Sequence, residues 1–181
     1  MTHHSKPPIF PKTRRHGGFA FAYVIGMIAL MAAIAAATIS MARTNSVANY
    51  IFNTTSSVYA AANVISTKIR YCPLSFPGGD NGTGYAIQYP GATTEVLVVS
   101  LVCPGRSAYT LFTGGDGVFL PQTPAQFTGW TYLNDSLGVR IKLVSDGSDA
   151  RNAILANVAA KFTTTEASLS GSTLTIWIKT P

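Results

Sequence analysis

The chain has 181 residues, of which 47% are hydrophobic and only 11% are charged, and its net charge at pH 7 is +6. Globular domains usually carry about 25% charged residues, so this composition excludes a charged disordered tail and a coiled-coil rod and disfavours an ordinary cytosolic enzyme. Residues 1–18 hold +4 of the net charge, and residues 19–181 hold only +2. Nucleic-acid binding needs several cations on one face. We therefore expect no nucleic-acid partner.

The three histidines, His3, His4 and His16, also precede residue 19. If this front segment is removed, the mature chain has no histidine, which excludes a Ser–His or Cys–His pair and any zinc site that uses histidine. The few carboxylates are scattered and form no acid–base pair. We expect no enzymatic activity, no catalytic residue and no cofactor.

Phe19 to Met41 form a run of 23 residues without a charge. A helix of this length is about 35 Å long, which is enough to cross a hydrocarbon core of about 30 Å. Four cations precede the run, and Arg43 follows it. The positive-inside rule then predicts a single-pass segment with a cytoplasmic N-terminus and an extracytoplasmic remainder.

Three interpretations of this segment compete. It is a simple signal anchor, or a cleaved signal peptide in which residues 35–37 form an A-x-A-like site. In the third interpretation the chain is cut before the apolar run, between Gly18 and Phe19, and the run is retained.

The residues around this junction, Arg14-Arg15-His16-Gly17-Gly18-Phe19, are followed at once by the apolar run. In this the chain resembles the type IV pilin and type II secretion pseudopilin family. The resemblance implies a leader at 1–18 that a prepilin peptidase removes after Gly18, followed by N-methylation of Phe19. It also implies that the helix is an inner-membrane anchor first and later the core of a filament of pilin or pseudopilin subunits built on an assembly platform.

The family usually has glutamate as its fifth mature residue, and here that position is Tyr23. The glutamate is thought to neutralise the N-terminal ammonium of a neighbouring subunit, because an unpaired charge in an apolar core is costly. Certain minor pilins and tip pseudopilins lack it, so we expect a minor or tip subunit. We expect assembly contacts along Phe19, Tyr23, Gly26, Ala29 and Ala33, since small residues allow close approach of helices.

Beyond Arg43 the helical pattern continues. Apolar or small residues recur at helical spacing at Val47, Ile51, Thr54, Val58, Ala61, Ile65 and Ile69, opposite a polar face of Asn49, Asn53, Ser56, Asn63 and Ser66. The pattern predicts one helix over 19–71 that Pro73 stops, with its transmembrane part at 19–41. The alternative is a membrane helix and a separate amphipathic helix, broken near 44–46.

Residues 72–181 are rich in Gly, Pro and Thr and predict an antiparallel sheet. A short helix is expected between Asp149 and Lys161, with Ser148 or Asp149 as its N-cap. The fold class is therefore α+β, with the long N-terminal helix packed on an antiparallel β-sheet head, as the pilin resemblance also implies. The candidate strands are 85–89, 95–102, 108–112, 127–133, 139–144, 162–169 and 173–179.

Cys72 ends the predicted helix, and Cys103 ends an apolar run. Two cysteines in an oxidising space usually pair, so we expect a disulfide that ties the helix to the sheet, the alternative being two buried thiols. The glycine-rich segment 114–117 lacks the Lys-Ser/Thr of a phosphate loop. Segments 80–82 and 146–149 lack the acidic density of a calcium loop. We expect turns at all three segments and no metal site.

These features predict a non-enzymatic structural subunit, a minor pilin or pseudopilin. It is inserted in the inner membrane and then assembled into a periplasmic or extracellular filament. The alternative is a secreted or membrane-anchored binding or adhesin module that carries an ordinary signal peptide or signal anchor.

Overall fold

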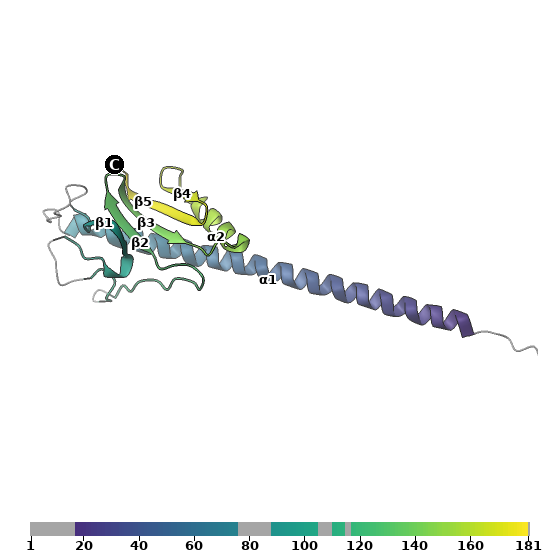
Figure 1. The fold of residues 1–181 in the computed structure, drawn as a ribbon. Coiled ribbons are helices and arrows are strands. Elements are labelled where there is room, and N and C mark those ends of the chain that lie inside the picture. Colours follow the sequence, from purple (N-terminus) through teal and green to yellow (C-terminus); the bar gives the residue numbers. More distant parts are fainter. Residues whose placement is uncertain (1–16, 76–87, 105–109, 115–116, 181) are drawn as a thin grey trace, which may run out of the picture. The chain divides into compact units, whose positions relative to one another are not determined.

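A computed structural model describes residues 17–75, 88–104, 110–114 and 117–180 (Figure 1). The described residues form two α-helices, five strands and one short 3₁₀ helix. In chain order these are α1 (Gly17–Ser75), β1 (Ala92–Leu97), η1 (Val98–Ser100), β2 (Thr131–Asp135), β3 (Gly138–Val144), α2 (Asp149–Ala159), β4 (Ala167–Ser170) and β5 (Thr173–Lys179).

Helix α1 is continuous over 59 residues. Residues 44–46 are helical, so the predicted single helix is confirmed and the alternative with a break there is wrong. The helix continues past Pro73 to Ser75. Pro73 lies in the last turn of the helix. It has no backbone N–H, so one helical hydrogen bond is missing there.

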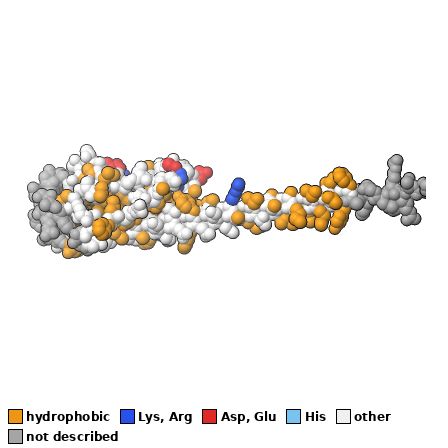
Figure 2. Space-filling view, turned by 90° about the horizontal axis from the view of Figure 1, so that it is seen from below, with side chains coloured by type: hydrophobic (Ala, Val, Ile, Leu, Met, Phe, Trp, Pro, Cys, Tyr) orange, Lys and Arg blue, Asp and Glu red, His pale blue; other side chains and the backbone are white. Residues whose placement is uncertain are grey.

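The contacts within the chain divide it into one compact unit up to Ser46 and another from Val47 onward. In the first unit every side chain described, from Phe21 to Ser46, is exposed. Hydrophobic side chains cover this part of α1 (Figure 2). Among the described residues, α1 is the one helix that is long and apolar enough to span a membrane, and an 18-residue stretch of it has a mean hydropathy of 2.3.

In the second unit α1 buries one side against the sheet. Val58, Ala61, Ile65, Ile69 and Cys72 are each at most 3% exposed. The predicted apolar stripe is therefore confirmed over this part, whereas its first member, Val47, is 51% exposed. Ser66 was predicted on the polar face but is buried, because it lies beside Ile65 and Ile69 on the side that faces the core.

The five strands form one antiparallel sheet in the order β1-β2-β3-β5-β4. Two-residue turns join β2 to β3 and β4 to β5, the second at Gly171-Ser172. Helix α2 connects β3 to the edge strand β4. Side chains of α1, α2 and the sheet share one core. The core strand residues include Tyr132, Val139, Ile141, Leu143, Leu174 and Ile176.

The predicted strand 95–102 is interrupted. Strand β1 ends at Leu97, and a 3₁₀ turn follows, in which the Ser100 hydroxyl donates to the Leu97 carbonyl at 2.7 Å. The turn buries Val98 and leaves Leu97 and Val99 about half exposed. A run of apolar residues without alternation does not specify which of its members faces the core, and here Val98 and Leu101 are buried whereas Val99 and Ser100 between them are exposed.

Two further predicted strands begin later than expected. Strand β4 begins at Ala167 rather than Phe162, because the backbone N–H and the hydroxyl of Thr163 both donate to the Glu166 carboxylate, at 3.0 and 2.9 Å. Such a Thr-x-x-Glu bonding pattern favours a turn. Strand β2 begins at Thr131, and Phe127 makes only an isolated bridge to Ser145.

The other predicted elements have mixed outcomes. Strands over 139–144 and 173–179 are confirmed, and so is the short helix, whose N-cap is Ser148. Of the strand predicted at 85–89, residues 85–87 lie outside the described residues and 88–89 form a turn and a bend. Of that predicted at 108–112, residues 108–109 lie outside them and Thr110 makes an isolated bridge to Val102.

The predicted disulfide is present. Cys72 and Cys103 are bonded across 31 residues of sequence, and both are buried. Their bond attaches the end of α1 to the segment that follows β1. A bridge across a loop of this length stabilises a fold by about 3–4 kcal/mol in the loop-entropy model.

We expect the double substitution Cys72→Ala/Cys103→Ala to lower the free energy of unfolding of the head by about 3 kcal/mol. Both tryptophans, Trp130 and Trp177, lie in the head, so their fluorescence during denaturation with urea reports on it alone. Reductant provides the control, since it should lower the stability of the parent chain and leave that of the variant unchanged. Equal urea midpoints for the parent and the variant would contradict this role of the disulfide.

Candidate functional site

The residues predicted for processing and assembly lie at the start of α1. Gly18 and Phe19 are in its first turns, and Tyr23 is 65% exposed. Gly26 has no heavy atom within 4 Å of the position that a Cβ would take, other than its own helix and chain neighbours. Ala29 and Ala33 are also exposed. Tyr23, Gly26, Ala29 and Ala33 therefore lie along an exposed part of α1.

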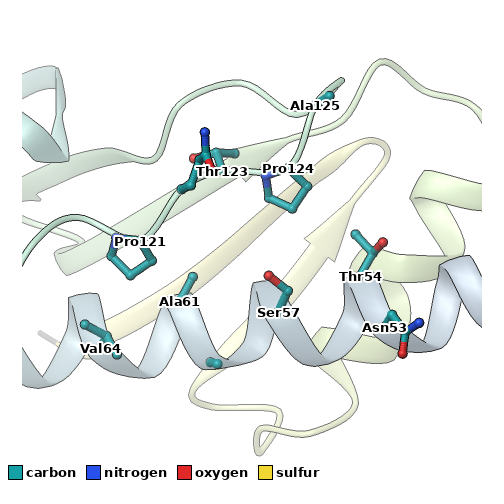
Figure 3. A pocket seen from close by; sticks show the side chains of 11 residues that line it. Asn53, Thr54, Ser57, Ala61, Val64, Pro121, Thr123, Pro124 and Ala125 are labelled. Carbon is teal, nitrogen blue, oxygen red and sulfur yellow. The ribbon is translucent and has the colours of Figure 1, made fainter.

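The second candidate is an open groove of about 870 Å³ between α1 and a loop that carries two prolines (Figure 3). From α1, the side chains of Thr54, Ser57 and Ala61 point toward the loop that holds Pro121 and Pro124 (Figure 3). The full lining consists of Asn53, Thr54, Ser57, Ala60, Ala61 and Val64 from the helix and residues 121–125 from the loop.

No charged or titratable side chain lines this groove. The α1 sequence from Thr44 to Thr67 has no Asp, Glu, Lys or Arg, and neither does the segment 117–134. The groove can therefore make van der Waals contacts and neutral hydrogen bonds, but its side chains supply neither a general base nor an electrophile. We did not single out this loop from the sequence, although its Pro-x-x-Pro spacing is a signal of extended chain.

The sheet face away from the core carries ion pairs. The Arg140 guanidinium donates to both Asp135 carboxylate oxygens, at 2.6 and 2.7 Å, and Arg140 is 8% exposed. Such bidentate pairs are the strong form of charged hydrogen bond. The hydrogen bonds between Arg140 and Asp135 hold the pKa of Asp135 below its usual range, and the same bonds raise the pKa of Arg140.

A second pair lies beside it, between β1 and β3. Glu95 accepts a hydrogen bond of 2.5 Å from the Thr131 hydroxyl and one of 3.2 Å from the Lys142 ammonium. Both hydrogen bonds lower the pKa of Glu95, and the bond from Thr131 has the larger effect. These carboxylates thus stabilise strand pairing, and none has the raised pKa of a general acid.

The segment 146–149, considered above for calcium, is bonded internally. One Asp146 carboxylate oxygen accepts from the Arg151 guanidinium, and the other accepts from the Ser148 backbone N–H at 3.2 Å. Among the described residues no group of three or more His, Cys, Asp or Glu could hold a metal ion. The segment 80–82 lies outside the described residues.

Comparison with known proteins adds no relative. No protein-family model, no curated protein and no solved structure matches this chain.

The ion pairs predict how the stability of the head depends on pH. The folded-state pKa values of Glu95 and Asp135 lie below their ordinary values of 4.5 and 3.8. Each carboxylate therefore stabilises the folded head at pH values above its ordinary pKa, and this stabilisation is lost as pH falls through its folded-state pKa. No histidine follows residue 16. We expect urea midpoints, followed by tryptophan fluorescence, to be flat from about pH 5.5 to 8 and to fall below about pH 4.

Asp135→Asn is the matched test of this assignment. It should destabilise the head at pH 7, because Arg140 is left buried without its carboxylate, and the fall in stability below pH 4 should become smaller. A variant with the stability and acid dependence of the parent chain would show that this pair contributes nothing.

Proposed function

We propose that this chain is a non-enzymatic structural subunit, a minor pilin or pseudopilin of a type IV pilus or type II secretion-like filament. It is processed after Gly18, anchored in the inner membrane by residues 19–41, and assembled with other subunits through its N-terminal helix. The head then lies in the periplasm or outside the cell.

The observation that carries the proposal is the continuity of α1. The helix begins at the Gly17-Gly18-Phe19 junction and runs without a break through the apolar run into the residues that pack on the sheet. A cleaved signal peptide requires no helix beyond its cleavage site, whereas a pilin-like subunit needs one helix that serves both the membrane and the head.

The exposure of α1 also supports assembly. Its described side chains from Phe21 to Ser46 are all exposed, and large apolar ones such as Ile28 and Met31 are 64% and 70% exposed. Exposed apolar surface of this extent in water marks a membrane or protein contact. The small residues Gly26, Ala29 and Ala33 would let a neighbouring helix approach closely.

We expect the mature protein, isolated from membranes or filaments of its native host, to begin at Phe19, with its N-terminus possessing a methyl group. Peptide mass spectrometry or Edman sequencing of the N-terminus measures this directly. A protein that began at Thr38 would instead be a signal-peptidase product, and one that began at Met1 or Thr2 would be an uncut signal anchor. Either result would overturn the proposal in favour of a secreted or anchored binding module.

The tyrosine at position 23 suggests a place at the filament tip. A subunit at the tip has no subunit beyond it whose N-terminal ammonium needs a carboxylate partner. Along the filament shaft, an unpaired ammonium next to Tyr23 would be buried at a high cost.

Tyr23→Glu should therefore increase the number of copies of this chain per filament, because the new carboxylate can pair with a neighbouring ammonium. Tyr23→Phe is the matched control, since it keeps an aromatic ring and adds no carboxylate. Quantitative mass spectrometry of purified filaments measures the copy number. The tip placement fails if the Glu and Phe variants are incorporated equally.

A further inference from the structure

A second groove lies between α1 and the end of α2, with a volume of about 500 Å³. Both of its walls belong to the compact unit that begins at Val47. Its lining is Ala48, Ile51, Phe52 and Thr55 from α1 and Asn157, Ala160 and Lys161 from the end of α2 and the residues after it.

Three of the four α1 residues that line this groove, Ala48, Ile51 and Phe52, are apolar and at least partly exposed. Phe52 is 72% exposed, and Ile51 beside it is partly exposed. An aromatic ring and a branched aliphatic chain on an open wall offer contact area suited to a hydrocarbon chain.

The polar groups of the groove are few and differ in kind. Thr55 is 6% exposed, and its hydroxyl has no hydrogen-bond partner among the described residues, which leaves a buried donor unsatisfied. Lys161 is the one charged residue in the lining. Its ammonium lies 5.4 Å from the centroid of the Tyr59 ring, and that ring packs against Phe162 at 5.3 Å. The cation is thereby held at the groove without a carboxylate in the lining.

The covalent chain keeps this groove close to a membrane. Ala48, the first residue of the groove, comes seven positions after Met41, the end of the apolar run. Even a fully extended link of this length reaches only about 25 Å. In a chain anchored by residues 19–41, the groove therefore meets lipid headgroups at a high effective concentration.

We propose that this groove binds an anionic phospholipid of the membrane that anchors the chain. The Lys161 ammonium pairs with the lipid phosphate, an ester carbonyl accepts a hydrogen bond from Thr55 or Asn157, and part of an acyl chain lies on Ile51 and Phe52. The proposal rests on the membrane anchoring in the proposed function, and it does not depend on cleavage or on filament assembly.

The experiment uses the full chain in lipid vesicles. Because both native cysteines are joined in the disulfide, a single introduced cysteine is the only free thiol. A bimane fluorophore is attached at Ala160→Cys, in the groove, or at Ser168→Cys, an exposed control position on β4. Quenching is then measured with brominated phosphatidylglycerol and with brominated phosphatidylcholine at equal mole fractions.

We expect quenching at position 160 to be at least about twice that at position 168, and to be stronger with the anionic lipid. Lys161→Gln should weaken the preference for the anionic lipid about fivefold, which corresponds to the loss of one cation near an anionic surface. Ala48→Cys gives a second reporter position in the groove if Ala160→Cys does not fold.

Equal quenching at positions 160 and 168, or equal quenching by the two lipids in the parent chain, would overturn the lipid site while leaving the proposed function intact. A chain that does not float with the vesicles would overturn the membrane anchor and the lipid site together. The N-terminus at Phe19 is measured independently of both outcomes.

Discussion

The structure depends on the burial of one side of α1 between Val58 and Cys72 against the sheet. This contact brings α1 into the hydrophobic core of the described residues, which it shares with α2 and with strands of the sheet. A helix in water gains most of its stability from packing of this kind rather than from intrinsic propensity. The second half of α1 is therefore ordered by the head, while the first half needs a hydrocarbon environment or neighbouring helices to cover its apolar side chains.

The sequence was sufficient to predict those features that depend on local pattern. The helical spacing from Val47 to Ile69 predicts the part of α1 in the head, and the pattern between Asp149 and Lys161 predicts α2. The sequence was insufficient where several local structures are compatible with the same pattern of residues. The run before Cys103 has no alternation, and only tertiary packing selects Val98 and Leu101 for the core. The Glu166 bonds to Thr163 likewise replace strand by turn, although the local composition favours strand.

The candidate sites also differ in whether they depend on local sequence or on segments that lie far apart in the chain. The proposed roles of Gly18, Phe19 and Tyr23 follow from the order of residues along the chain, which the sequence displays directly. The grooves on either side of α1 could not be predicted, because each joins helix residues to a segment about 60 or 100 residues further along. The Arg140–Asp135 pair also escaped prediction, since a turn between adjacent strands brings the two together and alternation alone does not distinguish a paired arginine from a solvated one.

Within the head, the core-facing side chains of α1 become more buried from Val47 toward Cys72. The far end of α1 is fixed by the disulfide at Cys72, whereas burial near Val47 is slight and Ile51 is only partly covered. Segments with few buried apolar contacts open at the lowest free energy. Within the head, the turns of α1 from Val47 to Thr55 are therefore the ones whose stability depends most on additional contacts, and the proposed lipid would supply such contacts in the groove that borders them.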